Sequence, residues 1–275
     1  MTAEGKTAAS QFLALTADYL TGGYRRPHAL GFEGDVFLAG PLTGTENGEA
    51  GDALNNSPKR EADSLEKVAE EVQRCAGCRL CEKRTRSVAG EGVREPLVLV
   101  VGEGPGADED AAGRPFVGKA GQLLDRMLAS IGLSRQKNCY IANVVKCRPP
   151  QNRDPAPDEI VSCSRFLSRQ IALLKPKVIF CAGRIAAQTI LHTATGIGSL
   201  RGHFEEYSTG GVFNETDRIT TGIAAFRIPL LATYHPSALL RNEDLKRPAW
   251  EDLKLLRSRL AELDSIYARE TAEQP

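Results

Sequence analysis

Four short apolar runs between residues 96 and 235 restrict the folds that this chain can adopt. Their residues are β-branched and apolar on both faces, which is typical of strands buried in a parallel sheet. The runs are PLVLVVGE (96–103), CYIANVV (139–145), KVIFCAG (177–183) and IPLLATYH (228–235). Between and after these runs, apolar residues recur at helical spacing. These segments are residues 121–133, 157–174, 184–192 and 246–264. This alternation predicts an α/β fold, a three-layer α/β/α domain with a four-stranded parallel central sheet.

Each apolar run ends in polar or glycine-rich sequence. The first ends in GEGPG (102–106), the second at Asn143, the third at Gly183 and the fourth at His235. Because ligands bind at the carboxyl edge of an open α/β sheet, these four ends predict one active site. The Asn143 amide can donate and accept a hydrogen bond at once, as reading a pyrimidine edge requires. His235 is a catalytic candidate, although a lone histidine is more often structural.

The loop GEGPGADED (102–110) follows the first predicted strand. It lacks the spacing of a dinucleotide fingerprint and the lysine of a phosphate-binding loop, and its acidic residues would repel a pyrophosphate. A neutral ligand and a positioned water suit it better, and a plain structural turn is the alternative. In GRPFVGKAGQ (113–122), Phe116 is placed to stack on a flat ligand. Taken alone, however, this residue is better explained as a side chain that packs in the hydrophobic core.

The seven cysteines point to metal binding and to a reducing compartment. Cys75 and Cys78 form a C-x2-C pair that Cys81 extends, and the other candidate pair is Cys147 and Cys163. A zinc ribbon would need a second C-x2-C pair, so four gathered thiolates suit an iron–sulfur cluster at least as well as zinc. The odd cysteine number disfavours a disulfide framework, and no secretory signal is recognisable. Two cysteines within apolar runs are expected to be core residues: Cys139 and Cys181.

The chain carries 35 basic and 35 acidic residues, but the charge is unevenly distributed. Residues 74–201 hold twenty basic and eleven acidic residues, a net charge of +9, between ends with net charges of −6 and −3. No run approaches the roughly 20 apolar residues of a membrane-spanning helix, so no membrane partner is expected. Residues 40–65 have the composition of a disordered acidic linker, and residues 9–22 have the spacing of a short helix.

Several of these motifs, taken in order, resemble the iron–sulfur uracil-DNA glycosylases of family 4. The resemblance covers residues 70–262 and rests on four strings: CAGC (75–78), GEGPGADEDAAGRPFVGKAGQLLDRML (102–128), NVVKCRPPQNRDPAPDE (143–159) and YHPSALLRN (234–242). It implies an N-terminal extension over 1–65, a catalytic domain over 66–265 and a polar tail over 266–275. The family fold, a four-stranded parallel sheet between helices, agrees with the strands predicted above.

The resemblance also implies a role for individual residues. Phe116 is expected to stack on uracil, Asn143 to hydrogen-bond its polar edge, and His235 to hydrogen-bond the departing base. Glu103 and Gly104 belong to the uracil-pocket loop. Glu109 or Asp110 is expected to hold the attacking water, with Glu109 preferred, and Leu239 to be the apolar wedge that fills the gap left by the flipped nucleotide. A 4Fe–4S cluster is implied on four cysteines: Cys75, Cys78, Cys147 and Cys163.

The resemblance thus predicts a monofunctional enzyme of base excision repair that releases free uracil from single- or double-stranded DNA. We expect a cytoplasmic monomer that acts on the chromosome. Two other functions are compatible with parts of the sequence: a non-catalytic iron–sulfur or zinc DNA-binding module, and a hydrolase of small nucleosides or nucleotides. The paired strand-end residues Asn143 and His235 argue against the first, and the basic middle segment argues against the second. Residues 207–227 are expected to form an extended hairpin loop.

Overall fold

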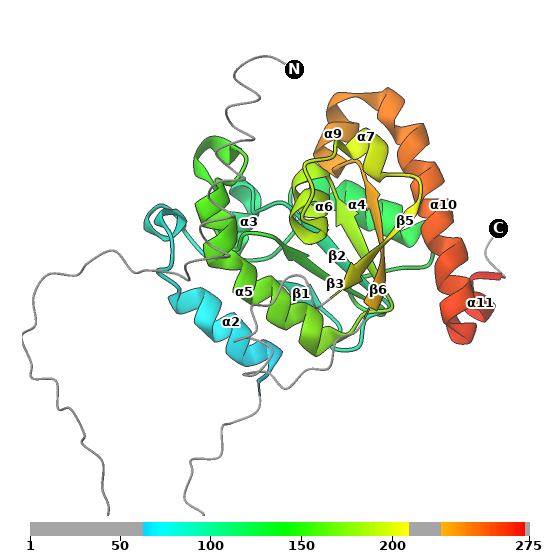
Figure 1. Ribbon diagram of the computed structural model, residues 1–275, viewed down its shortest axis with the longest axis horizontal. Coiled ribbons are helices and arrows are strands. Elements are labelled where there is room, and N and C mark those ends of the chain that lie inside the picture. The colour runs from blue at the N-terminus through cyan, green and yellow to red at the C-terminus, as the bar shows by residue number, and fades with distance from the viewer. Residues whose placement is uncertain (1–62, 209–226, 273–275) are drawn as a thin grey trace, which may run out of the picture. The chain divides into compact units, whose positions relative to one another are not determined.

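The computed structural model describes residues 63–208 and 227–272 (Figure 1). The predicted helix over 9–22, nearly all of the predicted linker and the centre of the 207–227 insertion lie outside these residues. The strands are β1 (Glu91–Gly92), β2 (Val98–Gly102), β3 (Cys139–Asn143), β4 (Val178–Ala182), β5 (Phe204–Ser208) and β6 (Arg227–Thr233). The α-helices are α2 (Leu65–Arg74), α3 (Ala107–Ala112), α4 (Lys119–Ala129), α5 (Pro157–Leu174), α6 (Arg184–Leu191), α7 (Ile197–Leu200), α9 (Pro236–Arg241), α10 (Lys246–Leu263) and α11 (Ser265–Ala272).

The central sheet confirms the four predicted parallel strands and corrects the extent of the sheet. In the described residues the strand order is β1-β3-β2-β4-β6-β5, and β3, β2, β4 and β6 are mutually parallel. The outer strands β1 and β5 pair antiparallel with β3 and β6, so the sheet is mixed and six-stranded rather than four-stranded. A two-residue strand such as β1 leaves no period-2 pattern in the sequence, which explains why it was not predicted.

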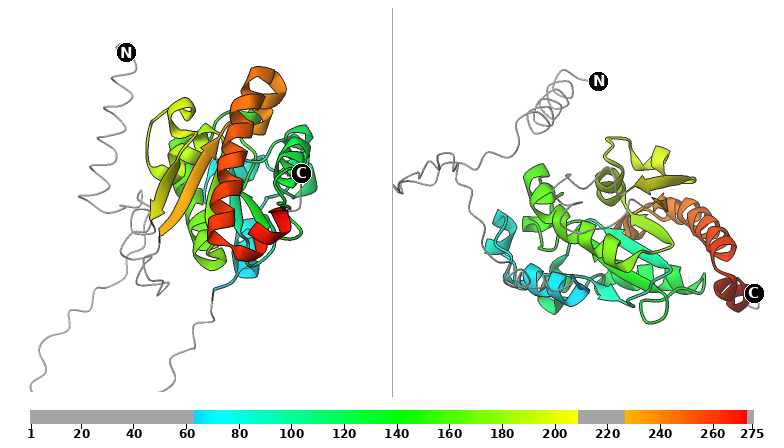
Figure 2. Two further views of the ribbon diagram at one scale, coloured as in Figure 1. Left: turned by 90° about the vertical axis from the view of Figure 1, so that its right-hand side faces the viewer. Right: turned by 60° about the horizontal axis from the view of Figure 1, so that its bottom comes forward.

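Two separate cores cover the two faces of the sheet and produce the predicted three layers (Figure 2). On one face α2, α5 and α6 pack against alternate residues of the strands, including Leu99 and Ile179. On the other face α4 and α10 pack against the intervening residues, including Val100 and Phe180. Every residue of β2, β3 and β4 is buried, as expected for parallel strands covered on both sides.

The carboxyl ends of the parallel strands lie in register at one edge of the sheet. Gly102 at the end of β2 pairs with Asn143 at the end of β3, and Ala182 at the end of β4 pairs with Thr233 at the end of β6. Since the chain continues from Thr233 into His235, four strand ends deliver their polar residues to the same place. This is the edge at which the sequence predicted a site.

The C-terminal region differs from the expected polar tail. Residues 265–272 form α11, in which Tyr267 and Thr271 are buried, and the Tyr267 hydroxyl donates a hydrogen bond to the backbone carbonyl of Ile131. One buried aromatic residue in a short polar segment gives too weak a pattern to predict this packing. Within the described segments, no helix combines the length and apolar character needed to cross a membrane.

Candidate active site and cysteine-lined cavity

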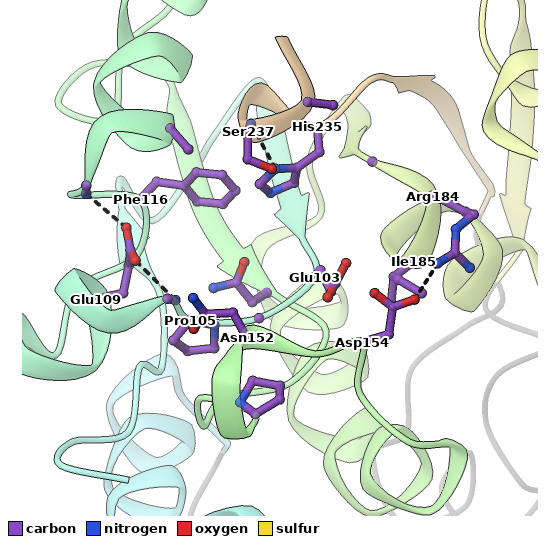
Figure 3. Close-up of a pocket in the computed structure, with 18 of the residues that line it drawn as sticks. Glu103, Pro105, Glu109, Phe116, Asn152, Asp154, Arg184, Ile185, His235 and Ser237 are labelled. Carbon is purple, nitrogen blue, oxygen red and sulfur yellow. Dashed lines mark hydrogen bonds and ion pairs between the residues drawn. The ribbon is translucent and has the colours of Figure 1, made fainter. Parts of the chain in front are cut away.

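A cavity of about 650 Å³ opens at the carboxyl edge of the sheet. It is lined by residues from the ends of β2, β3, β4 and β6, and Figure 3 shows their side chains converging on it. The structure brings together in this cavity all five residues that the sequence analysis assigned to base binding: Glu103, Gly104, Phe116, Asn143 and His235.

Gly102 makes room for the centre of the pocket. A Cβ atom at this position would lie 2.5 Å from the Asn143 Oδ1 atom and 2.5 Å from the Phe116 Cζ atom. The Asn143 amide and the Phe116 ring therefore meet directly over the strand end, and only a glycine permits it. The Phe116 ring also faces His235, with ring centroids 5.7 Å apart (Figure 3).

Asn143 is buried, and its Oδ1 atom has no hydrogen-bond partner within the described protein. A buried acceptor without a partner is costly, so its presence in a pocket indicates that a ligand supplies the donor. The backbone of Asn143 is held from behind by Lys146, whose Nζ atom donates to the Asn143 carbonyl at 2.8 Å and to Gln170 Oε1 at 2.7 Å. Lys146 was not predicted from the sequence; the signal for it is a lysine directly after the apolar run that ends in Val145.

His235 precedes α9 and caps its N-terminus. The Ser237 backbone N–H donates to His235 Nδ1 at 3.1 Å, so Nδ1 is an acceptor and the neutral ring carries its proton on Nε2. Burial lowers the pKa of His235 to about 4, and the nearby Arg241 charge acts in the same direction. Gly183 lies behind the ring, because a Cβ atom there would approach His235 Cβ to 2.9 Å. The histidine is thus a fixed, neutral hydrogen-bond donor.

Glu103 faces the pocket from the end of β2. Its partial burial, and secondarily the negative charge of Asp154, raise the pKa of this carboxyl to about 7. Asp154 itself forms an ion pair with Arg184 at the rim, opposite Glu103 (Figure 3). Near neutral pH the Glu103 side chain is therefore partly protonated and can donate as well as accept a hydrogen bond.

The two acids expected to hold the attacking water are engaged elsewhere. Glu109 lines the pocket, but its Oε1 atom accepts hydrogen bonds from the Val117 and Gly118 N–H groups and its Oε2 atom accepts from Gly106 N–H. Asp110 is buried outside the pocket lining, and both its oxygens accept from Thr85 N–H. The turn of α3 points the Asp110 side chain toward residue 85 and away from the pocket lining.

A third acid of the same motif, which the sequence analysis did not select, is Asp108. It lines the pocket beside Gly118.

The predicted apolar wedge is also placed differently. Leu239 lies on the inner side of α9 and is only 2% exposed, whereas the adjacent Leu240 is 48% exposed. A buried side chain would first have to leave the packing of α9 in order to enter the DNA helix. The exposed apolar side chain of this segment is Leu240.

The four cysteines assigned to a cluster line a second, smaller cavity, together with Cys81. Their sulfur atoms receive N–H groups: Arg84 Nη1 lies 3.1 Å from Cys147 Sγ, and the Lys146 backbone nitrogen lies 3.3 Å from Cys163 Sγ. Across residues 63–208 and 227–272, no three His, Cys, Asp or Glu side chains are arranged to hold one metal ion. Cys139 and Cys181 are fully buried in the two cores, as expected.

This donor set fits an iron–sulfur cluster. In a cubane cluster each cysteine binds a different iron atom, so the sulfur atoms surround a volume rather than converge on one point. Hydrogen bonds from N–H groups to the sulfur atoms are a feature of such sites. The cavity, its four thiols and their N–H donors therefore suit a cluster better than a single zinc ion.

Comparison with known proteins agrees with this geometry. The model of the uracil DNA glycosylase superfamily matches residues 89–254. A type-4 uracil-DNA glycosylase of Archaeoglobus fulgidus is 40% identical over 70% of this chain and 91% of its own length. Enzymes of the same name from Sulfurisphaera tokodaii and Saccharolobus solfataricus are 42% and 38% identical, over 71% and 72% of this chain and 84% and 88% of their own lengths. The chain therefore belongs to the uracil-DNA glycosylase superfamily and, within it, to the type-4 family.

Proposed function

We propose that this protein hydrolyses the N-glycosidic bond of uracil in DNA, releasing uracil and leaving an abasic site. The observation that carries the proposal is the unpartnered Asn143 Oδ1 atom, buried in a pocket that also presents an aromatic ring and a neutral histidine. A pyrimidine inside a duplex cannot reach such a pocket, so the nucleotide has to be flipped out of the helix first.

Base recognition follows from the chemistry of the Asn143 amide. Its Oδ1 atom would accept the uracil N3–H and its Nδ2 group would donate to the neighbouring O4, while the Phe116 ring stacks on the base. Cytosine presents the opposite donor and acceptor pattern at these two atoms, so it would leave the buried amide mismatched. We expect thymine to be excluded sterically at its 5-methyl group.

Bond cleavage leaves negative charge on the departing uracil and positive charge on the sugar. The His235 Nε2–H group is the fixed donor that would stabilise the anion at a carbonyl oxygen, an effect worth about 3 kcal/mol for one well-placed donor. Asp108 belongs to the loop GEGPGADED (102–110) and lines the pocket, and its charge would face the sugar. The partly protonated Glu103 adds little opposing charge near the uracil anion.

We further propose a 4Fe–4S cluster on Cys75, Cys78, Cys147 and Cys163. A bound cluster supplies a rigid cross-link of high charge density, and we assign it a structural role. The four residues belong to segments far apart in sequence, so a shared cluster would tie the α2 end to the β3–α5 connection. Lys146 is adjacent to Cys147 and donates a hydrogen bond to the Asn143 carbonyl, so the cluster would also help to fix the position of Asn143.

The partner is uracil-containing DNA, double- or single-stranded. The basic residues Lys119 and Arg241 line the pocket rim, where phosphates of a flipped nucleotide would lie. Leu240, exposed on α9, is the side chain that we propose fills the vacated base stack. We propose a monomer with a catalytic domain over 66–265, acting in the cytoplasm where its chromosomal substrate lies.

The test is incubation of the holoprotein with a labelled duplex that contains one U:G pair, followed by alkali. We expect cleavage at the uracil position and none in a T:G or C:G control. Free deoxyuridine is the second control, and its hydrolysis at a comparable rate would favour a nucleoside hydrolase. An absence of alkali-sensitive sites at enzyme excess, with the cluster absorbance intact, would overturn the proposal.

A further inference from the structure

The turn over residues 115–118, which carries Phe116, adopts a backbone conformation that needs support. Phe116 has a φ of +52°, in the left-handed region that bulky side chains disfavour. Such a conformation persists only where the surrounding structure holds it in place. The ring of Phe116 is 6% exposed and faces His235 across the pocket.

A buried arginine holds the carbonyl side of this turn. Arg135 follows α4, and its side chain is 5% exposed. Its Nη1 atom donates to the Pro115 carbonyl at 2.9 Å and its Nη2 atom donates to the Phe116 carbonyl at 3.0 Å. The guanidinium is oriented by Asp125, whose Oδ1 atom accepts from Nη2 at 2.7 Å and from Nε at 3.1 Å. This fork geometry is specific to arginine.

A carboxylate holds the amide side of the same turn. Glu109 Oε1 accepts from Val117 N–H at 2.8 Å and from Gly118 N–H at 3.0 Å, and its second oxygen accepts from Gly106 N–H. The first turn of α4 packs directly on the turn as well. A Cβ atom on Gly121 would lie 2.0 Å from the Phe116 carbonyl carbon and oxygen, so no other residue fits there.

We propose that Arg135 and Glu109 are positioning residues that clamp the Phe116 turn from its two sides and fix the ring for stacking on the flipped base. The cation binds the carbonyls of residues 115 and 116, and the anion binds the amides of residues 117 and 118. Glu109 therefore acts through Phe116 rather than on the attacking water. The inference rests on the proposed function, because it assigns the clamp to base binding.

The clamp predicts a specific kinetic pattern. The ring stacks on the base both in the flipped ground state and in the transition state. Weaker stacking therefore lowers the affinity for both states, and it changes the rate of the chemical step less. In single-turnover assays, Arg135→Lys should raise the half-saturating enzyme concentration about tenfold, and the maximal rate should fall less than that. The inhibition constant of free uracil should rise by the same factor. Lysine keeps the charge but cannot fork to two carbonyls.

Arg169→Gln is the matched control. Arg169 is another arginine held by two carboxylates, Asp63 and Glu71, and it lies outside the pocket lining. Loss of its ion pairs should lower the melting temperature without moving the half-saturating concentration or uracil inhibition. If Arg135→Lys and Arg169→Gln change only the melting temperature, Arg135 is merely structural and the clamp is overturned.

Glu109→Gln separates positioning from chemistry. A carboxamide oxygen can still accept from the Val117 and Gly118 amides, although the bond from Gly106 N–H is lost. The maximal rate should therefore stay within about tenfold, and the pH profile should keep its shape. A fall of more than about a hundredfold at unchanged half-saturation would place Glu109 on the reacting atoms and overturn the inference.

A binding measurement tests the clamp independently of cleavage. The probe is a duplex with 2′-fluoro-deoxyuridine, which resists hydrolysis, beside 2-aminopurine, whose fluorescence reports flipping. Wild type should bind and flip it, and Arg135→Lys should bind it more weakly. If wild type cleaves uracil but Arg135→Lys matches wild type here and in the kinetics, only the clamp fails. If wild type neither cleaves uracil nor prefers this probe to a thymidine duplex, the proposed function fails and the clamp with it.

Discussion

The Nδ1 atom of His235 lies 3.1 Å from the backbone nitrogen of Ser237 and accepts its hydrogen bond. This contact decides the protonation of the ring, because a charged imidazolium would have to place a hydrogen on the atom that already accepts one. With the proton on Nε2, the ring faces Phe116 and the pocket as a neutral donor. Removing this donor should expose its contribution to the rate.

We therefore expect His235→Ala to lower the maximal single-turnover rate about 100- to 1,000-fold, the usual effect of losing one donor to a developing anion. Because the folded protein lowers the pKa of His235 to about 4, the ring stays neutral as the pH falls from 8 to 5. His235 should therefore contribute no inflection to the wild-type rate near the ordinary histidine pKa. An inflection between pH 6 and 7 that disappears in His235→Ala would contradict the neutral-donor assignment.

Gly102→Ala should inactivate the pocket by steric displacement. The new methyl group would lie 2.5 Å from both Asn143 Oδ1 and Phe116 Cζ, so the amide and the ring both have to move. We expect a rate loss of at least about tenfold in the uracil release assay. Gly198→Ala is the control, because a Cβ atom there meets nothing within 4 Å, and it should keep wild-type activity.

Glu103 should make the stability of the protein depend on pH. The folded state raises its pKa to about 7, while in the unfolded chain this carboxyl ionises near its ordinary pKa of 4.5. As the pH rises from 4.5 to 7 the unfolded state loses its proton first, so the free energy of unfolding falls over this window. Glu103→Gln removes the effect and should be more stabilising, relative to wild type, at pH 8 than at pH 5. Equal shifts of melting temperature at both pH values would argue against it.

Cysteine variants should separate cluster ligands from neighbours. Cys163→Ser is expected to lose the visible absorbance of the cluster and to lower the melting temperature, because a bound cofactor stabilises the fold that holds it. Cys81→Ser is the matched variant, since Cys81 lines the same cavity without being one of the four proposed ligands. It should retain about four irons per chain. Loss of iron in Cys81→Ser with retention in Cys163→Ser would reverse the assignment.

The two adjacent leucines of α9 should behave differently when shortened. Leu240→Ala removes an exposed side chain, so we expect unchanged stability and a loss of about tenfold in activity on duplex DNA, with little change on single strands. Leu239→Ala removes a buried side chain and should destabilise the fold by about 2–5 kcal/mol. If Leu239→Ala selectively impaired duplex substrates at unchanged stability, the wedge would belong to Leu239.

The sequence predicted the parallel strands and their converging ends because both depend on strong local signals. Long apolar runs marked the strands, and parallel strands necessarily bring Asn143 and His235 to one edge. The side chains of α3 and α9 were placed less well. Neighbouring helical residues point about 100° apart, so consecutive acids or leucines such as Leu239 and Leu240 look alike in sequence while facing opposite environments. Arg135 was not predicted at all, because its partners are backbone carbonyls that no residue pattern marks.

Asn143 and Cys147 are separated by three residues in the turn that follows β3. One of these residues, Lys146, ties the Asn143 carbonyl to α5 through Gln170. An insertion or deletion in this turn would shift the Asn143 amide of the pocket and the cysteine-lined cavity together. We therefore expect relatives to keep the length of this turn.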